Sequence, residues 1–186
     1  ALINASAILL CSFVALLGLR FYLFALAARA DSNFFSLPYT TVIVACKGIE
    51  DNTRHNLLSI LTQTHPHYEV IFVTGSPNDP VIALLDQLVA AHPRARRLIA
   101  PPSDERGDKV NNVLYGITHA NPHSEVIAIF DSDGHAQPNF LARLVAPLQN
   151  NHISVTSGYR WFSPKNLNIT SITLTLWGSI VFALQA

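Results

Sequence analysis

Residues 69–89 read EVIFVTGSPNDPVIALLDQLV, and this stretch predicts one strand followed directly by one helix. The run 69–74 is rich in β-branched residues and is bounded by turn residues, as a buried strand should be. Asp79 is a good N-cap, Pro80 is accepted in a first helical turn, and apolar residues then recur at helical spacing as far as Val89. The segment therefore reads as strand, polar loop and helix.

The same alternation extends in both directions along the chain. Towards the N-terminus, residues 39–45 (YTTVIVA) predict a first strand and residues 52–62 a helix. Towards the C-terminus, the expected elements are a strand at 97–100, a helix at 108–120, a strand at 125–130, a helix at 140–148 and a fifth strand at 153–157. Such alternation predicts an α/β fold with a Rossmann-like, mainly parallel sheet covered by helices on both faces. Ligands of such sheets bind beyond the carboxyl ends of the strands.

The N-terminal residues have a different character. Residues 1–19 carry no charge, and apolar residues resume after Arg20. Because about 20 apolar helical residues span a bilayer, we expect a transmembrane anchor over residues 1–30 and a linker at 31–38. Arg20 and Arg29 follow the apolar run, which places the remaining chain on the cytoplasmic side of the membrane. A cleaved signal peptide and a buried helix of a soluble domain are the alternatives.

Composition limits the class of partner. The 186 residues include 12 basic and 12 acidic ones, so the chain has no broad positive field for a phosphate backbone, and we expect no nucleic acid partner. Methionine is absent and the sequence ends within the apolar stretch 169–184. We therefore expect a fragment of a longer protein.

Polar residues follow three of the predicted strands. Lys47 and Gly48 follow the first, residues 74–79 (TGSPND) end the second, and Asp131-Ser132-Asp133 ends the fourth. Two carboxylates this close would repel each other without a cation. Mg²⁺ or Mn²⁺ would suit their oxygens, and such an ion leaves the rest of its shell to phosphates and water. The alternative is a turn in which one aspartate caps the next helix.

Lys109 lies in the first turn of a predicted helix, where a cation opposes the helix dipole. Its presence there favours an anionic ligand, and the alternative is a solvated lysine paired with Asp104 or Asp108. The phosphate-binding G-x-x-x-x-G-K-[ST] motif and the dinucleotide-binding G-x-G-x-x-G motif are absent from the sequence. Nucleotide hydrolases and dehydrogenases are therefore disfavoured.

Four segments taken together resemble the family 2 and ceramide glucosyltransferase-like glycosyltransferases. They are Lys47-Gly48, EVIFVTGSPNDPV at 69–81, GDKVNN at 107–112 and IFDSDG at 129–134. The resemblance covers about residues 39–161. It implies a fold of the glycosyltransferase-A type truncated before the acceptor half, a UDP-sugar donor, and a divalent metal bridging the two donor phosphates. Residues 39–162 would form the nucleotide-sugar-binding half, and 163–186 an incomplete apolar segment leading to the acceptor half.

The resemblance also implies roles for individual residues. Many family members carry an acidic residue at the end of the second strand, but Thr74 and Gly75 stand there in this sequence. Asp79 is the nearest carboxylate, and it could either contact the donor or only cap a helix. The implied donor-binding residues are Lys47, Gly48, Asp79, Lys109, Asn112, Asp131 and Ser132, and the implied metal ligands are Asp131 and Asp133.

No catalytic residue is expected inside the fragment, because the family's general base and its Gln-x-x-Arg-Trp-like motif would lie beyond Ala186. The fragment alone should be inactive. The expected activity of the whole enzyme is transfer of a hexose, with glucose favoured, from a UDP-sugar to a lipid such as ceramide, with inversion. The alternatives are a polysaccharide synthase-type glycosyltransferase and a non-catalytic donor-binding relative.

Overall fold

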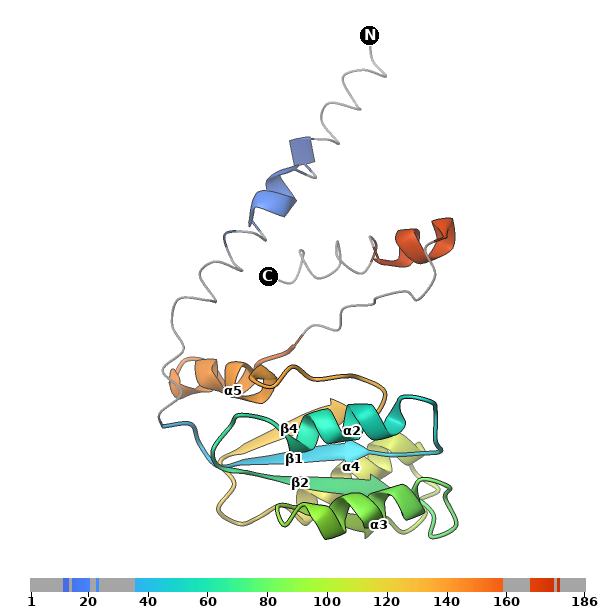
Figure 1. Ribbon diagram of the computed structural model, residues 1–186. Coiled ribbons are helices and arrows are strands. Elements are labelled where there is room, and N and C mark those ends of the chain that lie inside the picture. The colour runs from blue at the N-terminus through green and yellow to red at the C-terminus, as the bar shows by residue number, and fades with distance from the viewer. Residues whose placement is uncertain are drawn as a thin grey trace. The chain divides into compact units, whose positions relative to one another are not determined.

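The computed structural model describes residues 12–13, 15–20, 23, 36–158, 168–175 and 177. Residues 33–156 form one compact unit built on a four-stranded sheet (Figure 1). Its strands, all paired in parallel, are β1 (Thr40–Ala45), β2 (Tyr68–Thr74), β3 (Ala95–Ile99) and β4 (Val126–Asp131). They lie in the order β3-β2-β1-β4, so β1 sits between β2 and β4. The predicted α/β class and parallel sheet are confirmed.

The helices alternate with the strands along the chain. They are α2 (Thr53–Leu61), α3 (Ile82–Ala91), α4 (Asp108–Thr118) and α5 (Phe140–Val145), and a 3₁₀ helix η1 (Ala146–Gln149) follows α5. Apolar residues of α2, α3 and α5 share one cluster with the sheet. Tyr115 of α4 packs against a second cluster, made by residues of the opposite parity in β1 and β2. The sheet is therefore covered on both faces.

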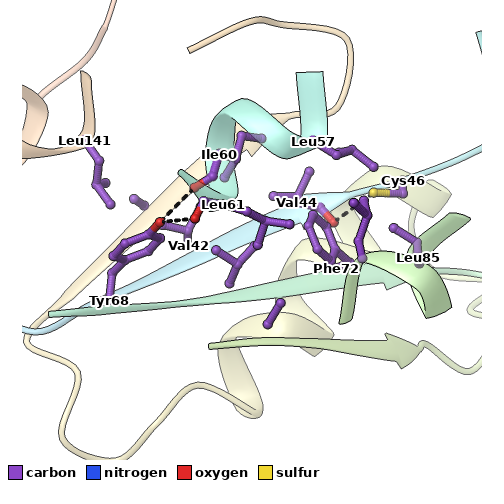
Figure 2. Close-up of a cluster of buried hydrophobic side chains, with 14 of the residues drawn as sticks. Val42, Val44, Cys46, Leu57, Ile60, Leu61, Tyr68, Phe72, Leu85 and Leu141 are labelled. Carbon is purple, nitrogen blue, oxygen red and sulfur yellow. Dashed lines mark hydrogen bonds between the residues drawn. The ribbon is translucent and has the colours of Figure 1, made fainter. Parts of the chain in front are cut away.

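The larger core lies between the sheet and helices α2, α3 and α5 (Figure 2). Phe72 of β2 is fully buried there, and Leu57, Leu85 and Leu141 bring one side chain from each of the three helices. Burying a side chain of this size stabilises the fold by about 1.5–3 kcal/mol. The hydroxyl of Tyr68 donates a hydrogen bond of 2.8 Å to the carbonyl of Leu61 at the end of α2.

On the opposite face, α4 approaches the sheet closely at Gly116. A Cβ atom at this position would lie 2.7 Å from Cγ2 of Ile43 and 3.2 Å from Cγ2 of Val73. Only glycine fits here without movement of the sheet or the helix. The close approach fixes the helix over β1 and β2, and with it the first turn of α4.

The fifth predicted strand is wrong. Residues 153–158 are described and belong to no strand, and the side chain of Val155 is 83% exposed. The hydroxyl of Thr156 instead donates a hydrogen bond of 2.7 Å to the carbonyl of Leu144. The β-branched residues of this segment suit a strand, but a strand also needs a partner edge, which local composition does not specify.

Three helix boundaries also differ from the prediction. The second predicted helix begins at Ile82 and not at Pro80, and α4 ends at Thr118. The helix predicted over 140–148 is α-helical only to Val145, after which the chain tightens into η1 with Pro147 in its first turn. Proline has no N–H to donate to the preceding turn, so the α-helical ladder ends there.

Of the anchor predicted over 1–30, only residues 12–13, 15–20 and 23 are described, and they are helical. Within the described part of the chain, no helix combines the length and apolar character needed to cross a bilayer. The remaining residues of the predicted anchor, most of the 31–38 linker and most of the 163–186 segment lie outside the described residues.

Candidate donor and metal site

The carboxyl ends of β1 and β2 are joined through Asp79. Its Oδ1 atom accepts two hydrogen bonds of 2.9 Å, one from the backbone N–H of Gly48 and one from that of Val81. Gly48 has a φ of +70°, a conformation that side chains disfavour. Asp79 thus holds the loop after β1 and also the turn that leads into α3, so the predicted capping contact shifts to the turn before the helix.

Cys46 lies just before this loop and is buried. Burial raises the pKa of its thiol to about 12, and the charge of Asp79 acts in the same direction. The thiol therefore stays protonated at neutral pH and is a poor nucleophile. Its role is to pack, as Figure 2 shows for its place in the core.

The first turn of α4 reaches across to β1. Nζ of Lys47 lies 2.8 Å from Oδ2 of Asp108, and both side chains are largely exposed. This hydrogen bond raises the pKa of Lys47 and lowers the pKa of Asp108. An exposed ion pair contributes little to folding, so the pair mainly sets where the lysine is held.

Lys109 reaches in the other direction, to β4. Its Nζ lies 2.5 Å from Oδ1 of Asp131, and the side chains are 66% and 44% exposed. Neither of the partners considered from the sequence, Asp104 and Asp108, takes this role. The structure therefore brings together a lysine predicted to bind the donor and a carboxylate predicted to bind the metal.

The carboxylates of the D-x-D motif sit where β4 ends. Asp131 is the last residue of β4 and is the register partner of Ala45 in β1, and Ser132 and Asp133 form the turn that follows. The described residues contain no group of three or more histidine, cysteine, aspartate or glutamate side chains that could hold a metal. Two carboxylates fit an Mg²⁺ or Mn²⁺ ion whose other positions are filled by phosphate and water.

Asn112 is the buried member of the predicted set. Its side chain is 4% exposed, and its Oδ1 atom has no hydrogen-bond partner within the described structure. A Cβ on Gly75 would lie 3.5 Å from this atom, in van der Waals contact, so the amide lies beside the backbone at the end of β2. A buried acceptor without a partner is costly, which favours a ligand that donates to it.

Thr74 is a residue that the sequence did not single out as a ligand. Its Oγ1 atom is also buried without a hydrogen-bond partner among the described residues. The only signal in the sequence was its position at the end of β2, followed by glycine. Of the predicted residues, the structure links Gly48 to Asp79 and Lys109 to Asp131. Ser132 lies between Asp131 and Asp133 in the turn that follows β4.

Comparison with known proteins shows similarity in both sequence and fold. The sequence matches the family described as Glycosyl transferase family 21 over residues 5–175. It is 29% identical over 125 residues to the ceramide glucosyltransferase of Candida albicans, covering 60% of this chain and 23% of that protein. The chain therefore spans about a quarter of the length of this curated relative.

The fold is similar to that of a mannosyltransferase from Pyrobaculum calidifontis, solved in complex with GDP-Man and Mn²⁺. The TM-score is 0.52 at 20% identity, covering 73% of this chain and 41% of the other. S. aureus TarS gives a TM-score of 0.48 at 19% identity, over 61% and 20% of the two chains. The similarity to the mannosyltransferase confirms the expected glycosyltransferase-A type of fold.

Proposed function

Because the chain belongs to glycosyl transferase family 21, we propose that it forms the donor-binding part of an enzyme that transfers a hexose from a UDP-sugar to a lipid. The chain is part of a glycosyltransferase, as the family match and the ceramide glucosyltransferase relative agree. Glucose is the favoured sugar, ceramide is the favoured class of acceptor, and the transfer is expected to proceed with inversion.

The observation that carries the donor proposal is the pairing of Lys109 with Asp131 at the carboxyl edge of the sheet. A nucleotide diphosphate needs cations for its phosphates, and a divalent ion needs carboxylates. Both kinds of group are within hydrogen-bond distance here, and Lys47, in the loop after β1, pairs with Asp108 in the same first turn of α4. The edge therefore carries the charges that a diphosphate and its metal require.

In this proposal Asp131 and Asp133 would hold Mg²⁺ or Mn²⁺, which stabilises the negative charge of the departing diphosphate. Lys109 would then pair with the donor phosphates. A single lysine carries one positive charge and cannot neutralise both carboxylates and the diphosphate, so the metal ion is needed as well. Gly48, whose backbone is held by Asp79, would form the side of the donor site next to β1. Asn112 and Thr74 would supply buried hydrogen-bond acceptors for parts of the nucleotide sugar other than its phosphates. Ser132 would contact the donor next to the metal ligands.

The lipid acceptor and the membrane belong to the same proposal. The uncharged run of residues 1–19 supports an N-terminal anchor, with the catalytic domain on the cytoplasmic side. An enzyme held at the bilayer can meet a lipid at its surface. The general base is proposed to lie in the part of the polypeptide that follows Ala186.

The test is a transfer assay with the purified full-length protein. Ceramide in detergent micelles is offered with radiolabelled UDP-glucose and Mn²⁺, and labelled lipid is measured. GDP-mannose serves as the matched donor control, and a chelator in place of Mn²⁺ as the metal control. Labelled glycolipid that depends on both UDP-glucose and the metal is expected. Equal labelling from GDP-mannose would contradict the donor assignment, and labelling that survives the chelator would contradict the metal.

A further inference from the structure

Helix α2 presents a row of polar side chains to the loop that follows the D-x-D motif. His55, Ser59 and Gln63 recur at four-residue intervals and so lie along one side of the helix and its C-terminal extension. Ser59 and Gln63 are 7% and 6% exposed. Buried polar groups are normally hydrogen-bonded, so the partners of these two side chains show what they do.

Both buried side chains bind the loop. Oγ of Ser59 accepts a hydrogen bond of 2.9 Å from the backbone N–H of Ala136. Nε2 of Gln63 donates a hydrogen bond of 2.9 Å to the carbonyl of Gln137, and its Oε1 accepts one of 2.8 Å from the N–H of Leu141. The two side chains thus hold three separate backbone groups over residues 136–141.

Two further contacts involve the same two segments. The backbone N–H of Thr64 donates a hydrogen bond of 2.7 Å to the carbonyl of Pro138. The rings of His55 and His135 stack with centroids 4.5 Å apart and planes 7° from parallel. The loop is therefore attached to α2 from residue 135 to residue 141, along most of the length of the helix.

The helix is a rigid support for these contacts. Leu57 and Ile60 are fully buried in the core, and the N–H of Gln63 donates to the hydroxyl of Tyr68 at 3.1 Å. The hydroxyl of Ser59 also donates to the carbonyl of Asn56 at 2.6 Å. The side-chain atoms of Ser59 and Gln63 that bind the loop all have hydrogen-bond partners. A buried network whose polar atoms are all paired favours one geometry.

The network fixes one end of a short segment, residues 132–135, that contains Asp133. On one side, Asp131 is held by the ladder between β4 and β1. On the other, Ala136 is held by Ser59. Only residues 132–135 lie between, and Asp133 is among them. The distance between the two fixed ends therefore limits where the second carboxylate can lie relative to the first.

We propose that Ser59 and Gln63 are positioning residues that set Asp133 against Asp131 for binding of the divalent cation. The proposal rests on the metal site proposed above. It assigns to α2, which supplies no ligand, a part in metal affinity. Groups that orient metal ligands commonly change affinity by about 10–100-fold when they are removed. Since Ser59 holds Ala136, three residues along the backbone from Asp133, we expect an effect near the lower value, about tenfold.

The experiment compares Mn²⁺ binding by variants of the full-length protein, followed by the electron paramagnetic resonance signal of free Mn²⁺ in the presence of UDP. Ser59→Ala removes the acceptor for Ala136, and Ser59→Thr restores a hydroxyl. Thr62→Ala is the matched control, because the hydroxyl of Thr62 bonds only to the carbonyl of Leu58 in the described structure, at 3.0 Å. Gln63→Met is a second test that removes the amide at nearly constant size.

Melting temperatures are measured beside binding, and binding is measured well below the lowest of them. We expect Ser59→Ala and Gln63→Met to weaken Mn²⁺ binding about tenfold, while Ser59→Thr and Thr62→Ala bind as the parent does. A role in folding alone would lower the melting temperature and leave Mn²⁺ affinity unchanged. That result, with Asp133→Asn still losing the ion, would overturn the positioning role and leave the metal site standing. Parental Mn²⁺ affinity in Asp133→Asn would overturn the metal site itself, and the positioning role with it.

Discussion

Nζ of Lys109 lies 2.5 Å from Oδ1 of Asp131, so the first turn of α4 places a cation against the last residue of β4. The lysine and a metal ion would therefore compete for the same carboxylate. A donor diphosphate removes the competition, because its phosphates offer the lysine a second anion. In the proposed site, this arrangement would link donor binding to metal binding through charge.

The first prediction follows from this competition. Lys109→Gln should raise the affinity for Mn²⁺ alone by a few-fold and should lower the affinity for UDP in the presence of Mn²⁺, because the lysine opposes the first and supports the second. Calorimetric titration of the full-length protein measures both. Arg106→Gln is the charge-matched control, since Arg106 pairs with Glu105. Loss of both affinities together would contradict the competition.

The second prediction concerns the charge on Asp133. Asp133→Asn keeps the size of the side chain but removes one formal charge from the proposed metal site. Transfer should fall by several orders of magnitude. The melting temperature should stay the same or rise slightly, because the repulsion between the two carboxylates is removed. Asparagine caps a turn about as well as aspartate, so a pure capping role predicts parental activity. Turnover and melting temperature, measured side by side, separate the two.

The third prediction is a loss of stability in mild acid caused by His65. The side chain is 1% exposed, its Nδ1 accepts from the N–H of His67 at 3.2 Å, and its Nε2 lies 3.4 Å from Oγ1 of Thr40. Burial lowers the pKa of His65 from 6.5 to about 4, and His67 acts in the same direction. Below pH 6.5 the unfolded chain therefore binds a proton that the folded chain resists.

The free energy of unfolding should thus be highest above pH 6.5 and should fall as the pH approaches 4, by on the order of 2 kcal/mol from this group. His65→Asn keeps an acceptor for the N–H of His67 and should flatten the dependence over this window. His123→Asn, which changes an exposed histidine, is the control. Denaturant unfolding at several pH values measures the effect, and an identical slope in parent and His65→Asn would contradict it.

The fourth prediction tests the close approach of α4. In Gly116→Ala the new methyl would overlap Cγ2 of Ile43 at 2.7 Å, which costs about 1–3 kcal/mol. The better helix propensity of alanine returns up to about 1 kcal/mol. A net loss of stability is expected. Gly107→Ala, where nothing lies within 4 Å of the added atom, should be close to neutral, and equal effects at the two positions would show that packing is not the cause.

The sequence predicted the elements whose signals are local. The β-branched runs at 39–45 and 69–74 became β1 and β2 almost residue for residue. The run at 153–157 had similar chemistry but formed no strand. Whether a β-rich segment joins a sheet depends on a free edge beside it, and this is a property of the assembled fold.

For the site, the sequence predicted which residues reach the carboxyl edge but not how they pair. That Lys109 faces Asp131 depends on where α4 lies over the sheet, and the close approach of Gly116 to Ile43 of β1 and Val73 of β2 helps to fix that position. Asn112 and Thr74 have buried oxygens with no hydrogen-bond partner among the described residues, which depends on tertiary packing and not on local sequence. The polar row on α2 was hidden for the same reason, since its partners are backbone groups of a distant loop.

The strand order β3-β2-β1-β4 also bears on how the molecule folds. Thr41 and its partner Glu69 in β2 are 28 residues apart, whereas the backbone N–H of Tyr39, just before β1, bonds to Glu125, 86 residues away and just before β4. Closing the longer loop costs more chain entropy, and distant pairings slow folding. We expect β1 and β2 to associate first and β4 to join a sheet that already exists. The D-x-D carboxylates arrive with β4, so the edge proposed to bind the cation is expected to be completed at the end of folding.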